Sequence, residues 1–528
     1  MKNGIVIIAL ALAVSAIAQT NPGTYRNPVI PGFHPDPSVC RVGEDYYLVT
    51  SSFEYFPGVP IFHSKDLVNW RQIGHVLTRK SQLDVSKAGA SGGIFAATIR
   101  FHDGTFYMIT TNMSGNGNFY VTARDPAGWW SDPFWVDKNV FDPSLFFDDD
   151  GKVYYTRRAD WELGGTQQAE IDIKTGKLLA PLKKIASGFV STDQEGPHLY
   201  KINGTYYLMP AEGGSRFTHM ETIGRSESPW GPFEPCPWNP ILANHDGWNE
   251  VRTTGHADLF QDHLGNWWMV HLATRHPNYG AMSVMGRETF LLPVTWKDGW
   301  PVVNGNGRSK IDVTAPLLPP HPFDPEPVRD DFDKPSLRFC WNFLRNPEEG
   351  SWSLAEKPGY LRLRGNAMNL DSIASPAFVG RRQEHYACTA TTRLYFKPEA
   401  ANEEAGLSCY MRDRFHYDIF RTVRGGKSVV VVRKTVADIR TETVVRPVKA
   451  DDVVLRITAD QYNYHLGIVE NGKFIEMDHA SCQSVATEVA NVWTGMFSAM
   501  FATGNGRPCA NPADFDWFEY SGMPEQGL

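Results

Sequence analysis

One local pattern recurs five times in the first 300 residues, and it constrains the fold more than any other feature of the chain. Each copy is a turn containing glycine, followed by two aromatic residues: VGEDYY, HDGTFYM, DDGKVYY, NGTYYL and HLGNWWM. The second aromatics, Tyr47, Tyr107, Tyr155, Tyr207 and Trp268, lie 60, 48, 52 and 61 residues apart. Asp-Gly and Asn-Gly favour hairpin turns because both residues tolerate positive φ. A short apolar segment precedes each turn, so each copy predicts an antiparallel hairpin.

Five β repeats of this length predict a propeller, in which each blade is a small antiparallel sheet around a central axis. The alternative is a β-sandwich with repeated aromatics, but a sandwich has no reason to repeat one local pattern five times. No segment of helical length and period stands out between the repeats. The predicted fold class is therefore all-β: a five-bladed β-propeller over residues 24–314, followed by a β-sandwich domain.

The boundary between the two domains is predicted from proline content. Residues 315–327, APLLPPHPFDPEP, form a proline-rich linker. Beyond it, segments such as SVVVVRKT and VVLRITA predict antiparallel strands, and a β-sandwich fits residues 328–523. Such a domain could cover the propeller, bind carbohydrate independently, or narrow a pocket by supplying an aromatic. We favour the pocket-narrowing role, with Trp493 to Phe501 as the candidate region.

Three carboxylates occupy the same place in three of the repeats. Counted back from the second aromatic, Asp36 lies 11 residues away, Asp142 13 and Glu195 12, while His256 and Phe95 lie 12 away in the other two repeats. If the first strand of each hairpin is innermost, all five positions converge at one mouth of the central channel. The sequence thus predicts a pocket lined by three acids, a histidine and an aromatic.

Proline follows Asp36 and Asp142 directly, and Gly-Pro follows Glu195. Proline has no N–H and restricts the residue before it to extended backbone, so we expect the acids on stiff, extended backbone at the start of each strand. Crowded carboxylates raise at least one pKa, which places a protonated acid beside an ionised base. Glycoside hydrolysis needs that combination.

The N-terminal residues 1–18 are predicted to be a signal peptide, with a short apolar run and a small-residue cleavage site before Gln19. We therefore expect an exported protein, periplasmic or secreted, without a membrane span. The net charge of −8 gives no support for nucleic-acid binding. The seven scattered cysteines contain no CxxC pair, and no contiguous calcium loop occurs.

Several longer stretches are similar to a known family. YRNPVIPGFHPDPSVCRVGEDYYLVTSSFEYFPG, SGGIFAATIRFHDGTFYM, FDPSLFFDDDGKVYY, DQEGPHLYKINGTYYLM, TTGHADLFQD and MGRETFLLPVTWKDGWPV resemble, in order, the blades of glycoside hydrolase family 43. The resemblance covers about residues 24–305. The C-terminal region resembles the β-sandwich of the family's β-xylosidase and α-L-arabinofuranosidase branch. This resemblance implies a five-bladed propeller and inverting chemistry.

The resemblance also implies roles for individual residues. Asp36 matches the general base that activates water, Glu195 the general acid, and Asp142 the acid that orients Glu195 and tunes its pKa. Substrate-binding residues are implied as well: Arg287, Phe53, Phe95 and His256. His256 matches the axial histidine, a candidate metal or water ligand. Phe95 stands where relatives often have Trp, which leaves the choice between xylopyranose and arabinofuranose open.

The expected function is an exo-acting, inverting glycoside hydrolase. It would release terminal α-L-arabinofuranose, β-D-xylose or both from hemicellulose side chains or plant oligosaccharides. The alternatives are a non-catalytic carbohydrate-binding propeller and a fructan-acting five-bladed hydrolase. No organic cofactor is expected, and a structural Ca²⁺ on the propeller axis or in the sandwich is compatible with the sequence. The sequence leaves the oligomeric state open.

Overall fold

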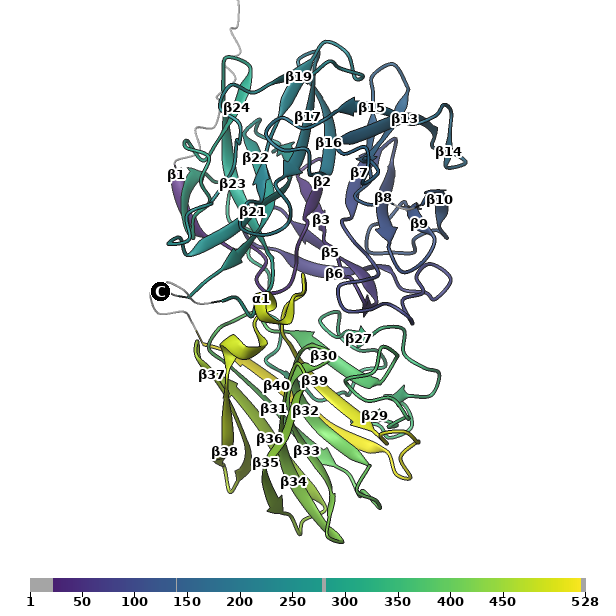
Figure 1. Cartoon of the computed structure of the whole chain (residues 1–528), viewed down its shortest axis with the longest axis vertical. Helices are drawn as coiled ribbons and strands as arrows, with labels where there is room; N and C mark the ends of the chain where they lie inside the picture. The colour runs from purple at the N-terminus through teal and green to yellow at the C-terminus, as the bar shows by residue number, and fades with distance from the viewer. Residues whose placement is uncertain (1–21, 139, 278–281, 524–528) are drawn as a thin grey trace, which may run out of the picture.

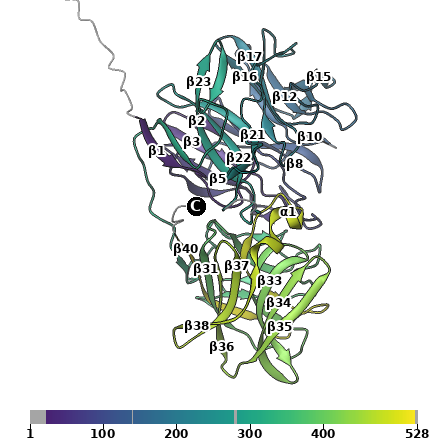
Figure 2. The same ribbon diagram turned by 60° about the vertical axis from the view of Figure 1, so that its left-hand side comes forward.

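The computed structural model describes residues 22–138, 140–277 and 282–523, which form two stacked β domains (Figures 1 and 2). The first domain is purple to teal in Figure 1, and the second is green to yellow. The predicted signal peptide lies outside the described residues. In the described part of the chain, no helix is long and apolar enough to cross a membrane.

Within the described residues, the first domain contains five antiparallel blade sheets, which confirms the predicted propeller. Blade one is β2 (Ser38–Val42), β3 (Asp45–Val49), β5 (Gly58–Ser64) and β6 (Arg71–Leu77). Blade two is β7 (Thr98–His102), β8 (Thr105–Asn112), β9 (Gly117–Ala123) and β10 (Phe134–Asp137). Blade three is β11 (Ser144–Phe147), β12 (Val153–Arg158), β13 (Thr166–Asp172), β14 (Lys177–Leu178) and β15 (Lys183–Ala186). Blade four is β16 (Gln194–Ile202), β17 (Thr205–Glu212), β18 (Met220–Glu221), β19 (Gly224–Ser226) and β20 (Glu234–Pro235). Blade five is β21 (Val251–Gln261), β22 (Trp267–Arg275), β23 (Glu288–Lys297) and β24 (Trp300–Val303).

The first strand of each blade is innermost, as the repeat predicts. β2, β7, β11, β16 and β21 contact one another in a closed ring. Each aromatic doublet lies in the second strand of its blade, where at least one ring is buried. Tyr47 of blade one, for example, packs against Phe106 of blade two with ring centroids 5.1 Å apart. The doublets therefore fill the space between neighbouring blades.

The buried Asp258 carboxylate links four of the blades through an ion pair and hydrogen bonds. Asp258 of β21 accepts hydrogen bonds from Ser38 at 2.6 Å, Arg100 at 2.8 Å and Tyr200 at 2.7 Å. Burial alone would raise the pKa of Asp258, but the Arg100 guanidinium holds that pKa well below its ordinary value. The buried Asp258 carboxylate is thus satisfied by hydrogen bonds from three other blades.

The ends of the propeller segment are tied together outside the blades. β1 (Pro22–Arg26) pairs antiparallel with β25 (Asp312–Pro316). Leu318, two residues beyond β25, is buried in the propeller core. The first residues of the predicted linker therefore pack on the propeller.

The second domain consists of two facing sheets around one core. One sheet has the order β28 (Trp352–Ser353), β29 (Leu361–Leu363), β40 (Ala513–Gly522), β31 (Cys388–Tyr395), β36 (Asp452–Ala459), β37 (Asn463–Glu470) and β38 (Lys473–Ser481), with β26 (Arg329–Asp330) beside β40. The other is β30 (Ala377–Arg382), β39 (Phe497–Thr503), β32 (Glu404–Arg412), β33 (Phe415–Arg424), β34 (Lys427–Val436) and β35 (Ile439–Pro447). Leu455 and Val432 meet in the core between them. The fold class is therefore a propeller followed by a β-sandwich, as predicted.

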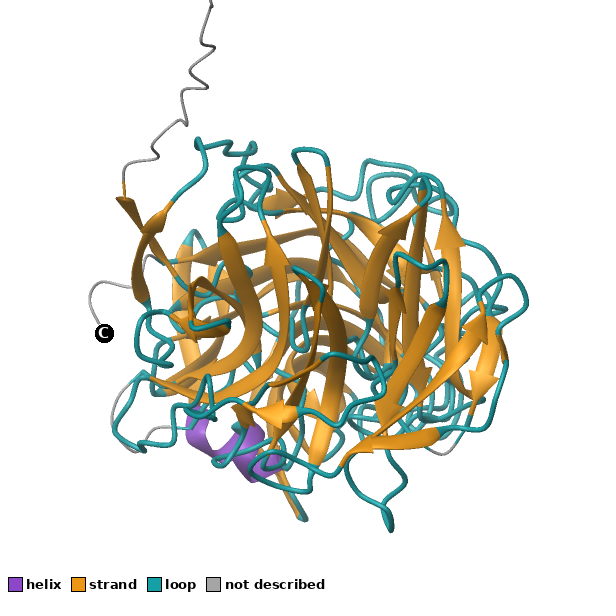
Figure 3. Cartoon of the chain, turned by 90° about the horizontal axis from the view of Figure 1, so that it is seen from above, coloured by secondary structure: helices purple, strands orange, loops and turns teal. Residues whose placement is uncertain are grey.

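The two domains are joined by backbone pairing and by a short helical segment. β4 (Tyr55–Phe56) of the propeller pairs with β27 (Phe343–Leu344) of the sandwich segment. The helical segment, η1 (Cys482–Val485) and α1 (Thr487–Ala490), lies at the junction in Figure 1. Figure 3, a view from above, shows helix in purple among the orange strands. The Thr487 N–H donates to the Ser283 carbonyl at 2.9 Å, so α1 is fixed to the propeller.

Candidate active site

All seven predicted site residues lie in one pocket at the mouth of the propeller, where it faces the sandwich. The pocket encloses about 760 Å³, including its open mouth. It is lined by Asp36, Phe53, Phe95, Ala96, Met113, Phe141, Asp142, Arg158, Trp161, Asp193, Glu195, Gly214, Ser215, His256, Arg287 and Trp493. The repeat therefore does bring the three carboxylates together.

The backbone at these acids differs from the extended geometry that the prolines predict. Asp36 has φ of 54° and Asp142 has φ of 58°, and His256 at the matching place has φ of 48°. These values lie in the left-handed region, which Asp and His visit more readily than most residues. The following proline fixes its own φ but not that of the acid. A left-handed residue turns the chain just before the inner strand, and such strained positions cluster at functional sites.

Glu195 departs from the exact repeat by one residue. The ladders begin at Ser38 in blade one and Ser144 in blade three, two residues after each aspartate. In blade four the regular ladder begins at His198, so the equivalent of the aspartates is Gly196. Glu195 lies within β16 rather than before it, and an irregularity in the pairing follows it. The third acid thus enters the pocket from a strand end.

Gly196 explains why blade four needs this offset. Its φ is 53°, and a Cβ there would lie 2.5 Å from the His256 ring. Only glycine fits at that position without displacing His256. A carboxylate at the equivalent place is therefore excluded by its neighbour, and the preceding residue supplies it.

Asp36 is buried and held from several sides. Its Oδ2 accepts a short hydrogen bond from the Ser51 hydroxyl, and its Oδ1 pairs with Arg287 Nη1 at 3.1 Å. His256 Nδ1 lies 3.6 Å from the same oxygen. With only 4% of its surface exposed, the carboxylate is fixed in direction and balanced by the Arg287 charge.

Asp142 and Glu195 are neighbouring acids in the pocket. Asp142 Oδ2 accepts a hydrogen bond of 3.2 Å from the Gly196 N–H, which adjoins Glu195. Burial, and then the charges of Glu195 and Asp36, raise the pKa of Asp142 well above its ordinary value. Its surroundings therefore favour the protonated form of Asp142.

Glu195 has the opposite surroundings. Burial would raise its pKa, but His219, whose Nε2 lies 3.3 Å from Glu195 Oε1, and the more distant His256 and Arg287 lower that pKa to about 2. The pKa values of the two carboxylates are thus shifted in opposite directions, in line with the crowding argument. The resemblance, by contrast, implies a protonated Glu195 during reaction.

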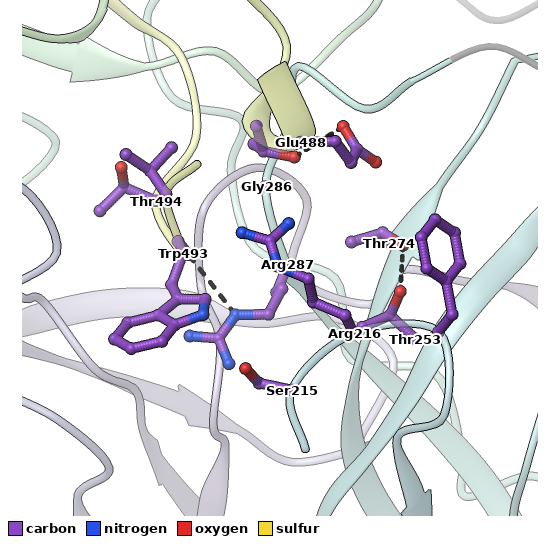
Figure 4. A pocket seen from close by; sticks show the side chains of 12 residues that line it. Ser215, Arg216, Thr253, Thr274, Gly286, Arg287, Glu488, Trp493 and Thr494 are labelled. Atoms are coloured by element: carbon purple, nitrogen blue, oxygen red, sulfur yellow. Dashed lines mark hydrogen bonds between the residues drawn. The ribbon is translucent and has the colours of Figure 1, made fainter. Parts of the chain in front are cut away.

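Aromatic side chains from both domains form one wall of the pocket. Phe53 and Phe95 have ring centroids 5.4 Å apart, and Trp493 lies 6.2 Å from Phe53 and 5.6 Å from Phe95. Trp493 follows α1 in the sandwich domain and is the first residue of the predicted Trp493 to Phe501 region. In the adjoining pocket of Figure 4, the Trp493 carbonyl accepts from Arg287 Nε at 3.4 Å. The sandwich therefore contributes directly to the pocket.

Several residues that sequence reasoning missed also belong to the site. His219 and Ser51 contact the acids, and neither lies in a repeated pattern. Arg158 lies over the Trp161 ring, 3.9 Å from its centroid, and pairs with Asp193 at 2.9 Å. Trp161 is 66% exposed on a loop, so it forms part of the rim. Only a close count of aromatic residues in loops could have suggested Trp161, and nothing in the sequence suggests His219.

The side chains of the pocket offer too few free ligand atoms to form a metal site by themselves. His256 offers one nitrogen, and the nearest carboxylate, Asp36, is already bound by Ser51 and Arg287. Ca²⁺ takes six to eight oxygen ligands. Among the described residues, the one group of three closely spaced metal donors is His465, Glu476 and His479, which lies in the sandwich.

Comparison with protein families gives two matches. Residues 25–301 match the family described as "Glycosyl hydrolases family 43", and residues 329–521 match "Beta xylosidase C-terminal Concanavalin A-like domain". The two matched segments correspond to the propeller and the sandwich.

Curated relatives and solved structures agree with these matches. The chain is 46% identical to a "Non-reducing end alpha-L-arabinofuranosidase" of Bacteroides ovatus, over 98% of this chain and 99% of the relative. It is 39% identical to a "Xylosidase/arabinosidase" of Butyrivibrio fibrisolvens, over 93% and 98% of the two chains. The solved structure named "Bacteroides ovatus Xyloglucan PUL GH43B" superposes with a TM-score of 0.92 at 46% identity, covering 95% of this chain and all of that one. A xylan beta-1,4-xylosidase from Bacillus halodurans superposes with a TM-score of 0.89 at 37% identity, covering 94% and 99%.

Proposed function

The chain belongs to family 43 of the glycosyl hydrolases, and from this membership and its pocket we propose how it releases a pentose from the non-reducing end of a glycan. The enzyme is an exo-acting glycosidase for terminal α-L-arabinofuranose, β-D-xylose or both. The observation that carries the proposed mechanism is the meeting of three carboxylates in one pocket with an aromatic wall. Asp36 and Asp142 are buried and Glu195 is partly buried, and each has different partners.

Asp36 is the proposed general base. Ser51 and Arg287 hold both of its oxygens in place, so the carboxylate can accept a proton from a water molecule beside the sugar. The water oxygen bonds to the anomeric carbon while the bond from that carbon to the leaving oxygen breaks. Attack from the face opposite the leaving group inverts the anomeric configuration.

Glu195 is the proposed general acid, and Asp142 supplies and positions its proton. The pKa of Asp142 is raised and that of Glu195 is lowered, so we propose that Asp142 holds one proton of the pair in the free enzyme. The Gly196 N–H links Asp142 to the backbone beside Glu195. We propose that substrate binding moves this proton to Glu195, whose carboxyl then donates it to the leaving oxygen. After one turnover, Asp36 has gained a proton and the Asp142–Glu195 pair has lost one. The starting state is restored when Asp36 releases its proton to solvent water and the pair takes one up from it.

The aromatic wall supports recognition of a single terminal sugar. Phe53, Phe95 and Trp493 present apolar faces to one side of the pocket, while Arg287 and His256 present polar groups. We propose α-L-arabinofuranosides as the preferred substrates, because the 46% identical relative bears that name and the smaller Phe95 replaces an expected Trp. Hemicellulose side chains and plant oligosaccharides are the proposed sources of such sugars.

The proposed reaction requires no organic cofactor, since water, a base and an acid complete it. We derive no step through Ca²⁺, because the donor set near His256 does not suit that ion. Export through the N-terminal signal segment, to the periplasm or outside the cell, is proposed from the sequence alone.

Paired variants separate the base from the acid. Asp36→Asn should lower kcat about 10²–10⁴-fold on both p-nitrophenyl α-L-arabinofuranoside and an arabino-oligosaccharide. Glu195→Gln should have a smaller effect on the p-nitrophenyl substrate, because p-nitrophenolate leaves without needing a proton, and a full effect on the oligosaccharide. The same assays with the β-D-xyloside measure the sugar preference.

Asp149→Asn is the matched control, since this carboxylate is 86% exposed in the turn between β11 and β12. It should keep wild-type turnover. If Asp36→Asn and Glu195→Gln also keep wild-type turnover on every substrate, the assignment is wrong. If both lose activity equally on both leaving groups, the division into base and acid is wrong.

A further inference from the structure

The outer hairpin of the sandwich, β37–β38, carries a cluster of side chains with metal-donor atoms, none of which lines the catalytic pocket. His465, Glu476 and His479 each offer one donor atom, and these three atoms lie within 4.8 Å of one another. β38 is the edge strand of its sheet, and the three side chains are half-buried to exposed. A metal ion from solution could therefore reach them.

The strand pairing explains how three donors reach one face. His465 lies directly opposite His479, so the two imidazoles share a face of the sheet. In regular pairing, Met477 would lie opposite Gly467 on that face, and Glu476 would point to the other. A bulge shifts the register between Leu466 and Gly467, so that Glu476 lies opposite Gly467 instead. The irregularity thus turns Glu476 toward the histidines.

Gly467 is part of the same arrangement. A Cβ at this position would lie 2.2 Å from the Ile475 carbonyl oxygen, so the bulged pairing requires glycine. Glycine also leaves open the space opposite Glu476. The bulge and its glycine therefore lie where the three donors meet.

The distances from the Glu476 carboxylate to the two imidazoles are close to those between ligands of a tetrahedral ion. Glu476 Oε2 lies 3.1 Å from His465 Nδ1, and Glu476 Oε1 lies 3.2 Å from His479 Nδ1. Zinc bonds of about 2.0–2.2 Å place tetrahedral ligands roughly 3.3 Å apart. Two imidazoles and a carboxylate are a common zinc ligand set, with water in the fourth position.

A carboxylate behind His465 completes the site. Asp460 Oδ2 lies 3.3 Å from His465 Nε2, the nitrogen that faces away from Glu476. Asp460 is itself fixed by the N–H groups of Tyr462 and Asn463, which donate to its Oδ1 at 2.7 Å each. Histidine ligands of metals commonly donate their other N–H to such a carboxylate, which orients the ring.

We propose that His465, Glu476 and His479 form a surface site for a divalent transition-metal ion, with Zn²⁺ the best match, and that Asp460 is its positioning residue. The bound ion links β37 to the edge strand β38 through side chains. It thereby stabilises the edge of the sandwich and takes no part in hydrolysis.

The test uses the full mature chain without a polyhistidine tag, stripped with chelator and titrated with ZnCl₂ by calorimetry. The wild type should bind one Zn²⁺ per chain at this site, and His479→Ala or Glu476→Gln should weaken that binding at least tenfold. Asp460→Asn should weaken it about 10–100-fold, the usual effect of losing such a partner. Co²⁺ should give the visible absorption of a tetrahedral site in the wild type and lose it in His479→Ala.

His102→Ala is the matched control, because His102 is also exposed beside an acid, Asp103 at 3.4 Å, but belongs to no group of three donors within the described residues. It should bind Zn²⁺ like the wild type. Metal-free His479→Ala should hydrolyse p-nitrophenyl arabinofuranoside at the wild-type rate. Absence of Zn²⁺ binding in the wild type, or equal binding in His479→Ala, overturns the proposal, whatever the catalytic activity.

Discussion

The propeller and the sandwich contribute to the same pocket in different ways. The propeller supplies Asp36, Asp142 and Glu195 from near-equivalent places in three blades, whereas the sandwich supplies Trp493 from a single loop after α1. Repetition makes the first contribution visible in the sequence, because a position that recurs must converge on the axis. A side chain that depends on domain packing has no such signature.

The sandwich is attached by buried polar groups as well as apolar ones. Arg345 is 1% exposed, and its Nε donates to the Ala88 carbonyl at 2.6 Å. Its backbone N–H donates to the carbonyl of Glu54 at 2.9 Å. Glu54 is fully buried, and burial raises its pKa to about 7 even with the Arg345 charge nearby. The domains are therefore expected to unfold together.

The largest effect is expected from a substitution that removes the Arg345 contacts between the two domains. Arg345→Met leaves the Ala88 and Ala374 carbonyls without their donor and removes the positive charge near Glu54, and it should destabilise the protein by about 3–5 kcal/mol. Urea unfolding followed by tryptophan fluorescence measures the loss. Arg440→Met, which removes an ion pair on a side chain 41% exposed, is the control and should cost at most about 1 kcal/mol. Equal costs for the two variants would mean that the buried contact does not join the domains.

The second prediction compares the aromatic residues that the two domains contribute to the pocket. Trp493→Ala removes the aromatic face supplied by the sandwich and should lower kcat/KM about tenfold, which corresponds to about 1.4 kcal/mol. Trp161→Ala, at the exposed rim on the propeller side, should lower it less. Steady-state kinetics on an arabino-oligosaccharide measure both. An unchanged kcat/KM in Trp493→Ala would mean that the sandwich covers the propeller without contributing to substrate binding.

The smallest effect concerns the coupled acids of the propeller. Asp142 has a raised pKa, so the pair with Glu195 keeps its shared proton to higher pH than Glu195 alone. Asp142→Asn leaves Glu195 next to His219, with its pKa held low. The alkaline limb of the kcat/KM profile should therefore move to lower pH by about one unit, as is usual when a neighbouring carboxylate is lost. A limb that stays in place, or moves to higher pH, contradicts the shared proton.

Much of the propeller could be predicted from the sequence because its physics is local. An aromatic doublet after a glycine turn specifies a hairpin, and five hairpins that each bury one face close into a ring. The inner position of the first strand, and so the meeting of Asp36, Asp142 and His256, follows from that closure.

The errors have physical causes too. Proline was expected to impose extended backbone on Asp36 and Asp142, but their φ values are positive because the turn into the inner strand dominates. Glu195 is displaced by one residue because only Gly196 fits against His256. His219, Ser51 and Trp161 were missed because their positions depend on tertiary packing, which no single repeat records.

The stereochemistry of the first product tests the central claim most directly, because a base at Asp36 and an acid at Glu195 must act on opposite faces of one sugar. Proton NMR during the first minutes of hydrolysis of an α-L-arabinofuranoside follows the anomeric signals before mutarotation. The account predicts that β-L-arabinofuranose appears first, with the α anomer rising later. Initial release of the α anomer would show retention and contradict the assignment of these two residues.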